Sequence, residues 1–179
     1  MRAESSLVPG ALLINGTVGV GKTSVAGAVG GLLTDAGIPN AVIDLDWLRQ
    51  SWPSPPGDRF NVTMMLRNLR SVAGNNLAAG AARLVVAGVV EDSDGRRQCG
   101  DALGVELTVC RLRAELATVR KRLRRRHENQ PDALRWHLAR AGELDGILDR
   151  AGVDDFTVDA TTRPVGEVAA DVVGKAGWL

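Results

Sequence analysis

The chain has 179 residues, a length that fits one domain with a substantial hydrophobic core. Hydrophobic residues make up 45% of the chain and charged residues 24%, as is ordinary for a globular protein. The formal net charge of +1 argues against general binding to nucleic acid or to membrane surfaces, and the apolar runs are too short to span a membrane. We therefore expect a single domain over 1–179 without nucleic-acid or membrane partners.

The cysteines and the N-terminal segment bear on where the protein is found. Cys99 and Cys110 are too few for a disulfide scaffold, and their spacing does not match a metal site. The segment 1–10 lacks the apolar core of a signal sequence. We expect a cytoplasmic protein that acts as a monomer or a homodimer.

A glycine-rich motif follows the first apolar run. Residues 11–14 predict a buried strand and residues 24–33 a helix, and 16–23 between them read Gly-Thr-Val-Gly-Val-Gly-Lys-Thr. This is the phosphate-loop pattern G-x-x-x-x-G-K-[ST] in the strand-loop-helix context that it requires. Glycines let the backbone N–H groups curve around a polyphosphate, and the helix adds the positive end of its dipole. A glycine-rich turn without a ligand is the alternative, which the complete motif disfavours.

The loop predicts a site for ATP and Mg²⁺. Lys22 is expected to reach the β- and γ-phosphates and to be catalytic, and the hydroxyl of Thr23 is expected to bind Mg²⁺. The expected nucleotide-binding residues of the loop are Gly16, Thr17, Val18, Gly19, Val20, Gly21, Lys22, Thr23 and Ser24.

Strands and helices alternate along the chain. The predicted strands cover 11–14, 41–44, 84–90, 105–112 and 156–159. The predicted helices cover 23–35, 61–79, 95–103, 115–127, 132–151 and 165–175. This alternation predicts a three-layer α/β/α fold, and the uninterrupted apolar run of the third strand is typical of a central parallel strand.

An acidic pair follows the second predicted strand. Asp44 and Asp46 lie where the carboxyl edge of an open α/β sheet binds ligands. One carboxylate can orient an acceptor hydroxyl as general base while the other joins the Mg²⁺ shell. Alternatively, one of them caps a helix that starts at Trp47. We expect at least one to be catalytic, with Asp46 the stronger candidate, and Trp52, in the following proline-rich loop, to be open to substrate.

These features together resemble the P-loop small-molecule kinases of the nucleoside and nucleotide kinase group over the full length of the chain. The sequence D-L-D-W-L-R at 44–49 is similar to the D-G-D-x-x-R of adenylylsulfate kinases, and N-L-R-S-V-A at 68–73 is similar to their N-I-R-x-V-A. The resemblance implies a five-stranded parallel sheet in the order 2-3-1-4-5 and transfer of the ATP γ-phosphoryl group to an acceptor. The resemblance suggests that Asp46 handles the acceptor hydroxyl and that Arg49 and Arg70 hold an anionic part of the acceptor. With Trp52 and Arg67, these are the expected substrate-binding residues.

Two further segments resemble parts of this group. The sequence R-L-R-R-R at 122–126 resembles the R-L-x-x-R that opens the lid of gluconate kinases and their relatives. It implies a lid at about 126–136, with Arg122 near the adenine and a catalytic Arg126 on the transferring phosphate. The sequence D-A-T-T-R-P at 159–164 resembles the adenine-side loop, where Arg163 and Pro164 would flank the base.

Departures from the adenylylsulfate kinases leave the acceptor open. The sequence A-G-V-V-E-D at 87–92 replaces their F-I-S-P-x-R, and their lysine-rich lid is missing. A conventional Walker-B aspartate is not evident, so Glu91 or Asp92 either replaces it or belongs to a surface loop. The expected function is an ATP-dependent phosphotransferase acting on a hydroxyl of a small, anionic or nucleoside-like metabolite. The alternative is an ATP-binding switch or weak ATPase, and the choice between ATP and GTP stays open.

Overall fold

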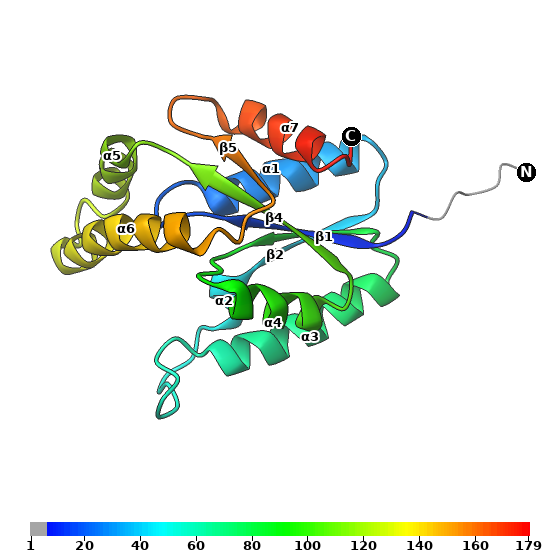
Figure 1. Ribbon diagram of the computed structural model, residues 1–179, viewed down its shortest axis with the longest axis horizontal. Coiled ribbons are helices and arrows are strands. Elements are labelled where there is room, and N and C mark those ends of the chain that lie inside the picture. The colour runs from blue at the N-terminus through cyan, green and yellow to red at the C-terminus, as the bar shows by residue number, and fades with distance from the viewer. Residues whose placement is uncertain (1–6) are drawn as a thin grey trace, which may run out of the picture.

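The computed structural model describes residues 7–179 (Figure 1). The strands are β1 Gly10–Asn15, β2 Asn40–Asp44, β3 Arg83–Ala87, β4 Glu106–Arg113 and β5 Phe156–Asp159. The helices are α1 Lys22–Asp35, α2 Leu45–Leu48, α3 Val62–Ala78, α4 Ser93–Leu103, α5 Leu116–Arg126, α6 Pro131–Ala151 and α7 Val165–Lys175. Residues 1–6, part of the segment expected to lack a signal sequence, lie outside the described residues. Across 7–179, no helix combines the length and the apolar character needed to cross a bilayer.

The five strands form one parallel sheet in the order β2-β3-β1-β4-β5. This order confirms the topology that the resemblance implies. The central strand is β1, whose Ile14 lies opposite Ala87 of β3 and Cys110 of β4. The strands run toward the edge of the sheet where α5 and α6 lie, at the left of Figure 1. Ligands bind at the carboxyl edge of such sheets, so this end of the molecule holds the candidate site.

Side chains of β1 alternate between two hydrophobic cores. Leu12 and Ile14 pack with α1 and α7 on one face, while Ala11 and Leu13 pack with α3 and α4 on the other. Figure 1 shows the sheet between these two helix layers. All four side chains are at most 1% exposed. Burial on both faces explains why the strand reads as an unbroken apolar run, and it confirms the three-layer prediction.

The third strand is shorter than its apolar run predicts. It ends at Ala87, although the apolar residues continue to Val90. Beyond the strand, Gly88 packs so closely on Leu45 that a Cβ at this position would collide. The N–H of Val90 donates to the side chain of Asn15 at 3.2 Å instead of to a neighbouring strand. An apolar run therefore marks burial here, and only its first part marks strand pairing.

Helix α4 is longer than predicted. It begins at Ser93, because the carboxylate of Asp92 accepts a hydrogen bond of 2.7 Å from the N–H of Gly95. Such a cap satisfies an N–H group of the first helical turn that has no partner within the helix. The predicted start at residue 95 overlooked this cap.

Candidate active site

A cleft of about 1200 Å³ opens at the carboxyl edge of the sheet. It is bordered by the phosphate loop, by the segments that follow β2 and β3, and by α5 and α6. Pockets for one small molecule usually measure about 300–1,000 Å³. The cleft therefore has room for two ligands side by side.

The three glycines of the phosphate loop all have left-handed backbone conformations. The φ angles are 142° at Gly16, 80° at Gly19 and 110° at Gly21. A Cβ at Gly16 would also approach the carbonyl oxygen of Leu112 to 2.8 Å, and one at Gly19 would approach Leu123 of α5 to 2.8 Å. Both the turn and the close packing of the loop therefore require glycine.

Lys22 lies across the loop that precedes it. Its Nζ donates to the carbonyl oxygens of Gly16 at 2.8 Å and Thr17 at 2.9 Å. An ammonium group has three donors, so one remains for a ligand in the cleft that Lys22 lines. Burial lowers the pKa of Lys22 to about 8, although Asp46 and Asp44 act to raise it. The arrangement fits the predicted contact of Lys22 with a polyphosphate.

Most of the predicted loop residues reach the cleft. Those that line it are Val18, Gly19, Gly21, Lys22, Thr23 and Ser24. Gly16, Thr17 and Val20 are buried behind them. The N-cap of α1 is Gly21, which offers no side-chain cap, so the first-turn N–H groups of α1 remain available to an anion.

Asp44 combines the two roles that were weighed for the acidic pair. Its Oδ2 accepts a hydrogen bond of 2.8 Å from the hydroxyl of Thr23, and its Oδ1 accepts one of 2.9 Å from the N–H of Asp46. The second bond caps α2, which begins at Leu45 and not, as expected, at Trp47. The capping aspartate thus also lies beside the predicted Mg²⁺ ligand.

The pair formed by Thr23 and Asp44 suits Mg²⁺. This ion prefers oxygen ligands, takes few of them from the protein, and completes its shell with phosphates and water. In the described part of the chain, no cluster of three or more Asp, Glu, His or Cys side chains is arranged to hold a metal. A hydroxyl and a carboxylate beside the phosphate loop are the donors that a nucleotide-bound Mg²⁺ requires.

Asp46 faces the cleft with a largely exposed side chain. Its carboxylate is 74% exposed and lies 3.8 Å from Nε of Arg49. Both residues line the cleft, as predicted. Unlike Asp44, whose two oxygens are engaged, Asp46 can accept a hydrogen bond from an incoming hydroxyl.

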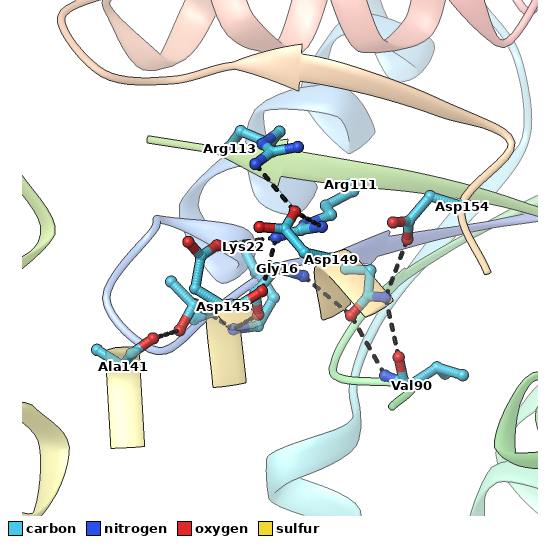
Figure 2. Close-up of polar contacts among 11 residues, drawn as sticks. Gly16, Lys22, Val90, Arg111, Arg113, Ala141, Asp145, Asp149 and Asp154 are labelled. Carbon is cyan, nitrogen blue, oxygen red and sulfur yellow. Dashed lines mark hydrogen bonds and ion pairs between the residues drawn. The ribbon is translucent and has the colours of Figure 1, made fainter. Parts of the chain in front are cut away.

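A buried asparagine anchors the start of the loop, and its partners Gly16 and Val90 are labelled in Figure 2. Asn15, at the end of β1, is 0% exposed. Its Oδ1 accepts from the N–H of Gly16 at 2.9 Å, and its Nδ2 donates to the carbonyl of Val90 at 3.1 Å. The side chain thus joins the phosphate loop to the segment after β3. Sequence reasoning missed Asn15, although a polar residue that ends an apolar strand was a visible signal.

Helix α6 is attached to the loop and to the sheet. The hydroxyl of Thr17 donates to the carbonyl of Ala141 in α6 at 2.6 Å. Arg111 of β4, only 3% exposed, forms ion pairs of 2.8 Å with Asp145 and Asp149 of α6, as Figure 2 shows. These contacts fix the part of α6 that follows the predicted lid.

The predicted lid, 126–136, spans the end of α5, a turn and the start of α6. Arg126 lines the cleft, in keeping with its predicted role near the phosphate. Arg122 also lines the cleft, but its guanidinium donates to the carbonyls of Val20 at 3.1 Å and Ala160 at 2.7 Å. Arg122 therefore joins α5 to the phosphate loop and to the loop at 159–164, which is predicted to contact the adenine.

Some predicted residues lie outside the cleft lining. They are Trp52, Arg67, Arg70, Arg163 and Pro164. Arg67 and Arg70 are exposed on α3, and Trp52 is exposed in the loop before it. Arg163 pairs with Asp171 of α7 at 2.9 Å. The described arrangement does not bring these residues to the other site residues, and their binding roles stay predictions.

Residues on α6 add to the cleft in a way that sequence reasoning missed. Arg140 lines it and pairs with both Glu91 and, at 3.1 Å, Glu143. Glu91 is therefore partnered by α6, while Asp92 caps α4. Trp136 also lines the cleft.

No protein-family model matches the chain, and no curated protein matches its sequence. Solved structures do match it. The tunicamycin resistance protein of Deinococcus radiodurans is 22% identical, with a TM-score of 0.68 over 96% of this chain and 97% of that one. The APS kinase of Mycobacterium tuberculosis, in complex with AMPPNP and APS, is 22% identical, with a TM-score of 0.61 over 95% and 98%. A gluconokinase from Sinorhizobium meliloti 1021 is 18% identical, with a TM-score of 0.60 over 94% and 92%.

The chain has the fold of the P-loop small-molecule kinases. The comparison agrees with the resemblance drawn from the loop and from the residues after β2. At such low identity a common fold does not specify an acceptor, because P-loop kinases with different acceptors share it.

Proposed function

We propose that the protein is an ATP- and Mg²⁺-dependent phosphotransferase that moves the γ-phosphoryl group to a hydroxyl of a small metabolite. The observation that carries the proposal is the group formed by Lys22, Thr23 and Asp44. An ammonium held inside a glycine loop lies next to a hydroxyl–carboxylate pair joined at 2.8 Å, in a cleft with room for two ligands. Neighbours named as kinases, one of them with AMPPNP and APS bound, support the proposal at the level of fold.

On this proposal, different residues bind the polyphosphate and the Mg²⁺. Lys22 and the free N–H groups at the start of α1 hold the polyphosphate. Thr23 and Asp44 hold Mg²⁺, which when bound neutralises phosphate charge. Arg126, at the start of the predicted lid, is close enough to Lys22 for its positive charge to lower the pKa of that lysine. Arg126 therefore lies on the phosphate side. The lid excludes water, which competes with the acceptor.

Asp46 acts on the acceptor. The acceptor oxygen forms a bond to the γ-phosphorus as the bond from that phosphorus to the β–γ bridging oxygen breaks. The electron pair of the broken bond leaves on ADP, and the hydroxyl proton passes to the carboxylate of Asp46. The motifs at 44–49 and 68–73 taken alone favour an anionic or nucleoside-like acceptor. A cytoplasmic location, a single domain and action as a monomer or homodimer belong to the same proposal.

The test is ATP consumption in the presence of a panel of small alcohols. A kinase consumes ATP only when a suitable acceptor is present, whereas an ATP-binding switch or weak ATPase binds or slowly hydrolyses ATP without one. The lack of a carboxylate at Ala87 and Gly88, where β3 ends, favours that second candidate. Acceptor-independent hydrolysis would decide for it, and failure to bind Mg²⁺ with an ATP analogue in calorimetry would exclude both.

A further inference from the structure

The acceptor side of the cleft has an exposed aromatic rim. It consists of Trp47 in α2 and Phe60 in the loop before α3, and Trp136 of α6, the last residue of the predicted lid, lines the same cleft. Their exposed fractions are 72%, 47% and 47%. The chain has only six aromatic residues, four Trp and two Phe without any Tyr. Half of them therefore stand exposed in this cleft.

Of the other three aromatic residues, Trp52 is exposed outside the cleft lining, and two are packed in the ordinary way. Phe156 and Trp178 pack against the core between the sheet and α1 and α7. Large apolar side chains usually go inside, and where several are exposed together they mark a binding surface. The rim and the phosphate loop line the same cleft. The ligand that the rim favours is therefore the phosphoryl acceptor, which would bind beside the nucleotide.

The lining below the rim is apolar as well. Val62, Met65, Leu66 and Cys99 line this side of the cleft. Met65 and Cys99 are each 3% exposed and form its floor. Burial raises the pKa of the Cys99 thiol to about 11, so this thiol is uncharged at neutral pH. An apolar body is the chemistry that such a surface binds.

Two basic groups on the acceptor side have partners in the chain. The Nη2 of Arg49 contacts Sδ of Met65 at 2.7 Å, and its Nε, which has no hydrogen-bond partner, lies 3.8 Å from the carboxylate of Asp46. Arg140 is held between Glu91 and Glu143. An anionic acceptor would have to separate these pairs and approach the exposed carboxylate of Asp46. A neutral or cationic acceptor meets neither obstacle.

We propose that the acceptor is an uncharged or cationic alcohol with a planar, largely apolar body, held by Trp47, Phe60 and Trp136. Trp47 directly follows Asp46 in α2, so one short helix presents both a ring for the body and the carboxylate for the hydroxyl. The inference rests on the proposed function. It differs from the anionic acceptor that the motif at 68–73 suggests, because Arg67 and Arg70 lie outside the cleft lining.

The test uses alcohols that share one frame and differ in charge. They are 1-phenylethane-1,2-diol, which is neutral, 2-amino-1-phenylethanol, which is cationic, and mandelate, which is anionic. Each is added to the full chain with Mg²⁺ and a non-hydrolysable ATP analogue while tryptophan fluorescence is recorded, and then with ATP while its consumption is measured. We expect the first two to bind and to be phosphorylated, and mandelate to bind about tenfold more weakly.

Two variants test whether the aromatic rim binds the alcohol. Trp47→Ala and Trp136→Ala should each raise KM for the accepted alcohol about tenfold, since each removes an aromatic contact and the area that it covers. For Trp47→Ala the affinity for the ATP analogue should not change. The matched control is Trp178→Leu, which alters an aromatic residue packed on the core and should leave KM for the alcohol unaltered.

Two kinds of failure can be told apart. Lack of ATP-analogue binding by the unmodified chain would refute the proposed function. With the analogue bound, the acceptor inference alone is overturned if mandelate binds as tightly as the diol, or if none of the frame compounds binds. It is equally overturned if both tryptophan variants keep the KM of the unmodified chain.

Discussion

The phosphate side and the acceptor side of the cleft are built in different ways. On the phosphate side the chain itself supplies the partners of polar groups: Asn15 is fully buried and bonded, and Lys22 donates to two carbonyls of its own loop. On the acceptor side Trp47 and Trp136 stand exposed, and the carboxylate of Asp46 is open. One side is organised before a ligand arrives, and the other has surface that only a ligand would cover.

This difference suggests how changes on the two sides should act. Groups that are already fixed lose little freedom on binding and can stabilise charge that develops during transfer. Changes on the phosphate side should therefore lower the rate or the stability of the fold. Changes on the acceptor rim should mainly alter KM for the acceptor, as proposed above for Trp47 and Trp136.

The variant Lys22→Ala should show the largest effect and would remove the central group of the phosphate side. We expect kcat for an accepted alcohol to fall about 10³-fold or more, because a preorganised charged donor is lost. The carbonyls of Gly16 and Thr17 also lose their donor, so affinity for the ATP analogue should fall too. Lys175→Ala, at a lysine that pairs with Asp171 on α7, is the control. Full turnover by Lys22→Ala would contradict the catalytic role given to the phosphate side of the cleft.

The variant Asp46→Asn tests the proposed general base, which lies between the phosphate side and the acceptor side. We expect kcat to fall about 10²–10³-fold, because the amide cannot accept the hydroxyl proton, while affinity for the ATP analogue is retained. The companion variant Asp44→Asn should instead raise the Mg²⁺ concentration needed for activity, since this carboxylate lies beside Thr23. Steady-state kinetics at varied Mg²⁺ separates the two. The reverse pattern would exchange the roles of the aspartates.

Local sequence patterns predicted the phosphate side and the layers of the fold. The loop is a run of consecutive residues between a strand and a helix, so its conformation follows from glycine positions close together in the chain. The order of the sheet followed from a resemblance supported by the same motif. The contacts that fix the loop from outside were not predictable in this way. Asn15 meets Val90 at a separation of 75 residues, and Thr17 meets Ala141 at a separation of 124.

The acceptor side was predicted less well for the same reason. Its lining comes from α2, α3, α4 and α6, which no single motif connects. The motif at 68–73 suggested an acceptor contact at Arg70. In the structure Asn68 of this motif donates to the carbonyl of Leu48 at 2.8 Å and joins α3 to α2, while Arg70 is exposed. Asn68 of this motif thus packs one helix on another, while the binding role of Arg70 stays a prediction.

The variant Arg111→Leu would weaken the support of the phosphate side. Arg111 is buried, and its loss leaves the carboxylate of Asp145 without its partner and that of Asp149 with Arg113 alone. Removing one member of a buried pair costs up to 3–5 kcal/mol, but these carboxylates are partly hydrated, so we expect about 2 kcal/mol. Denaturant unfolding measures the loss, and Arg150→Leu at an exposed position of α6 is the control, expected within about 0.5 kcal/mol. Equal midpoints for the two variants would show that the pairs do not hold α6.

The pH dependence of activity should show the smallest effect. It should alter kcat/KM for ATP, which reports on the phosphate side, and leave KM for the alcohol, which reports on the acceptor side, unchanged. Burial lowers the pKa of Lys22 to about 8, so in the free protein the ammonium loses its proton above this pH. We expect kcat/KM for ATP to fall by up to about tenfold per pH unit above pH 8. Bound phosphate favours the ammonium, so kcat should persist to higher pH. KM for the alcohol should not follow this titration, because the rim carries no such group.

The stability contribution of Lys22 should move in the opposite direction. Its pKa is 10.5 in the unfolded chain and about 8 in the folded one, so between these values the unfolded chain binds more protons. The contribution of Lys22 to the free energy of unfolding therefore rises with pH across this window, while nucleotide binding weakens. Denaturant unfolding from pH 7.5 to 10 should show this slope in the unmodified chain and lose it in Lys22→Met. A kcat/KM profile that stays flat to pH 10, together with equal slopes, would mean that Lys22 is not the buried ammonium on which the phosphate side depends.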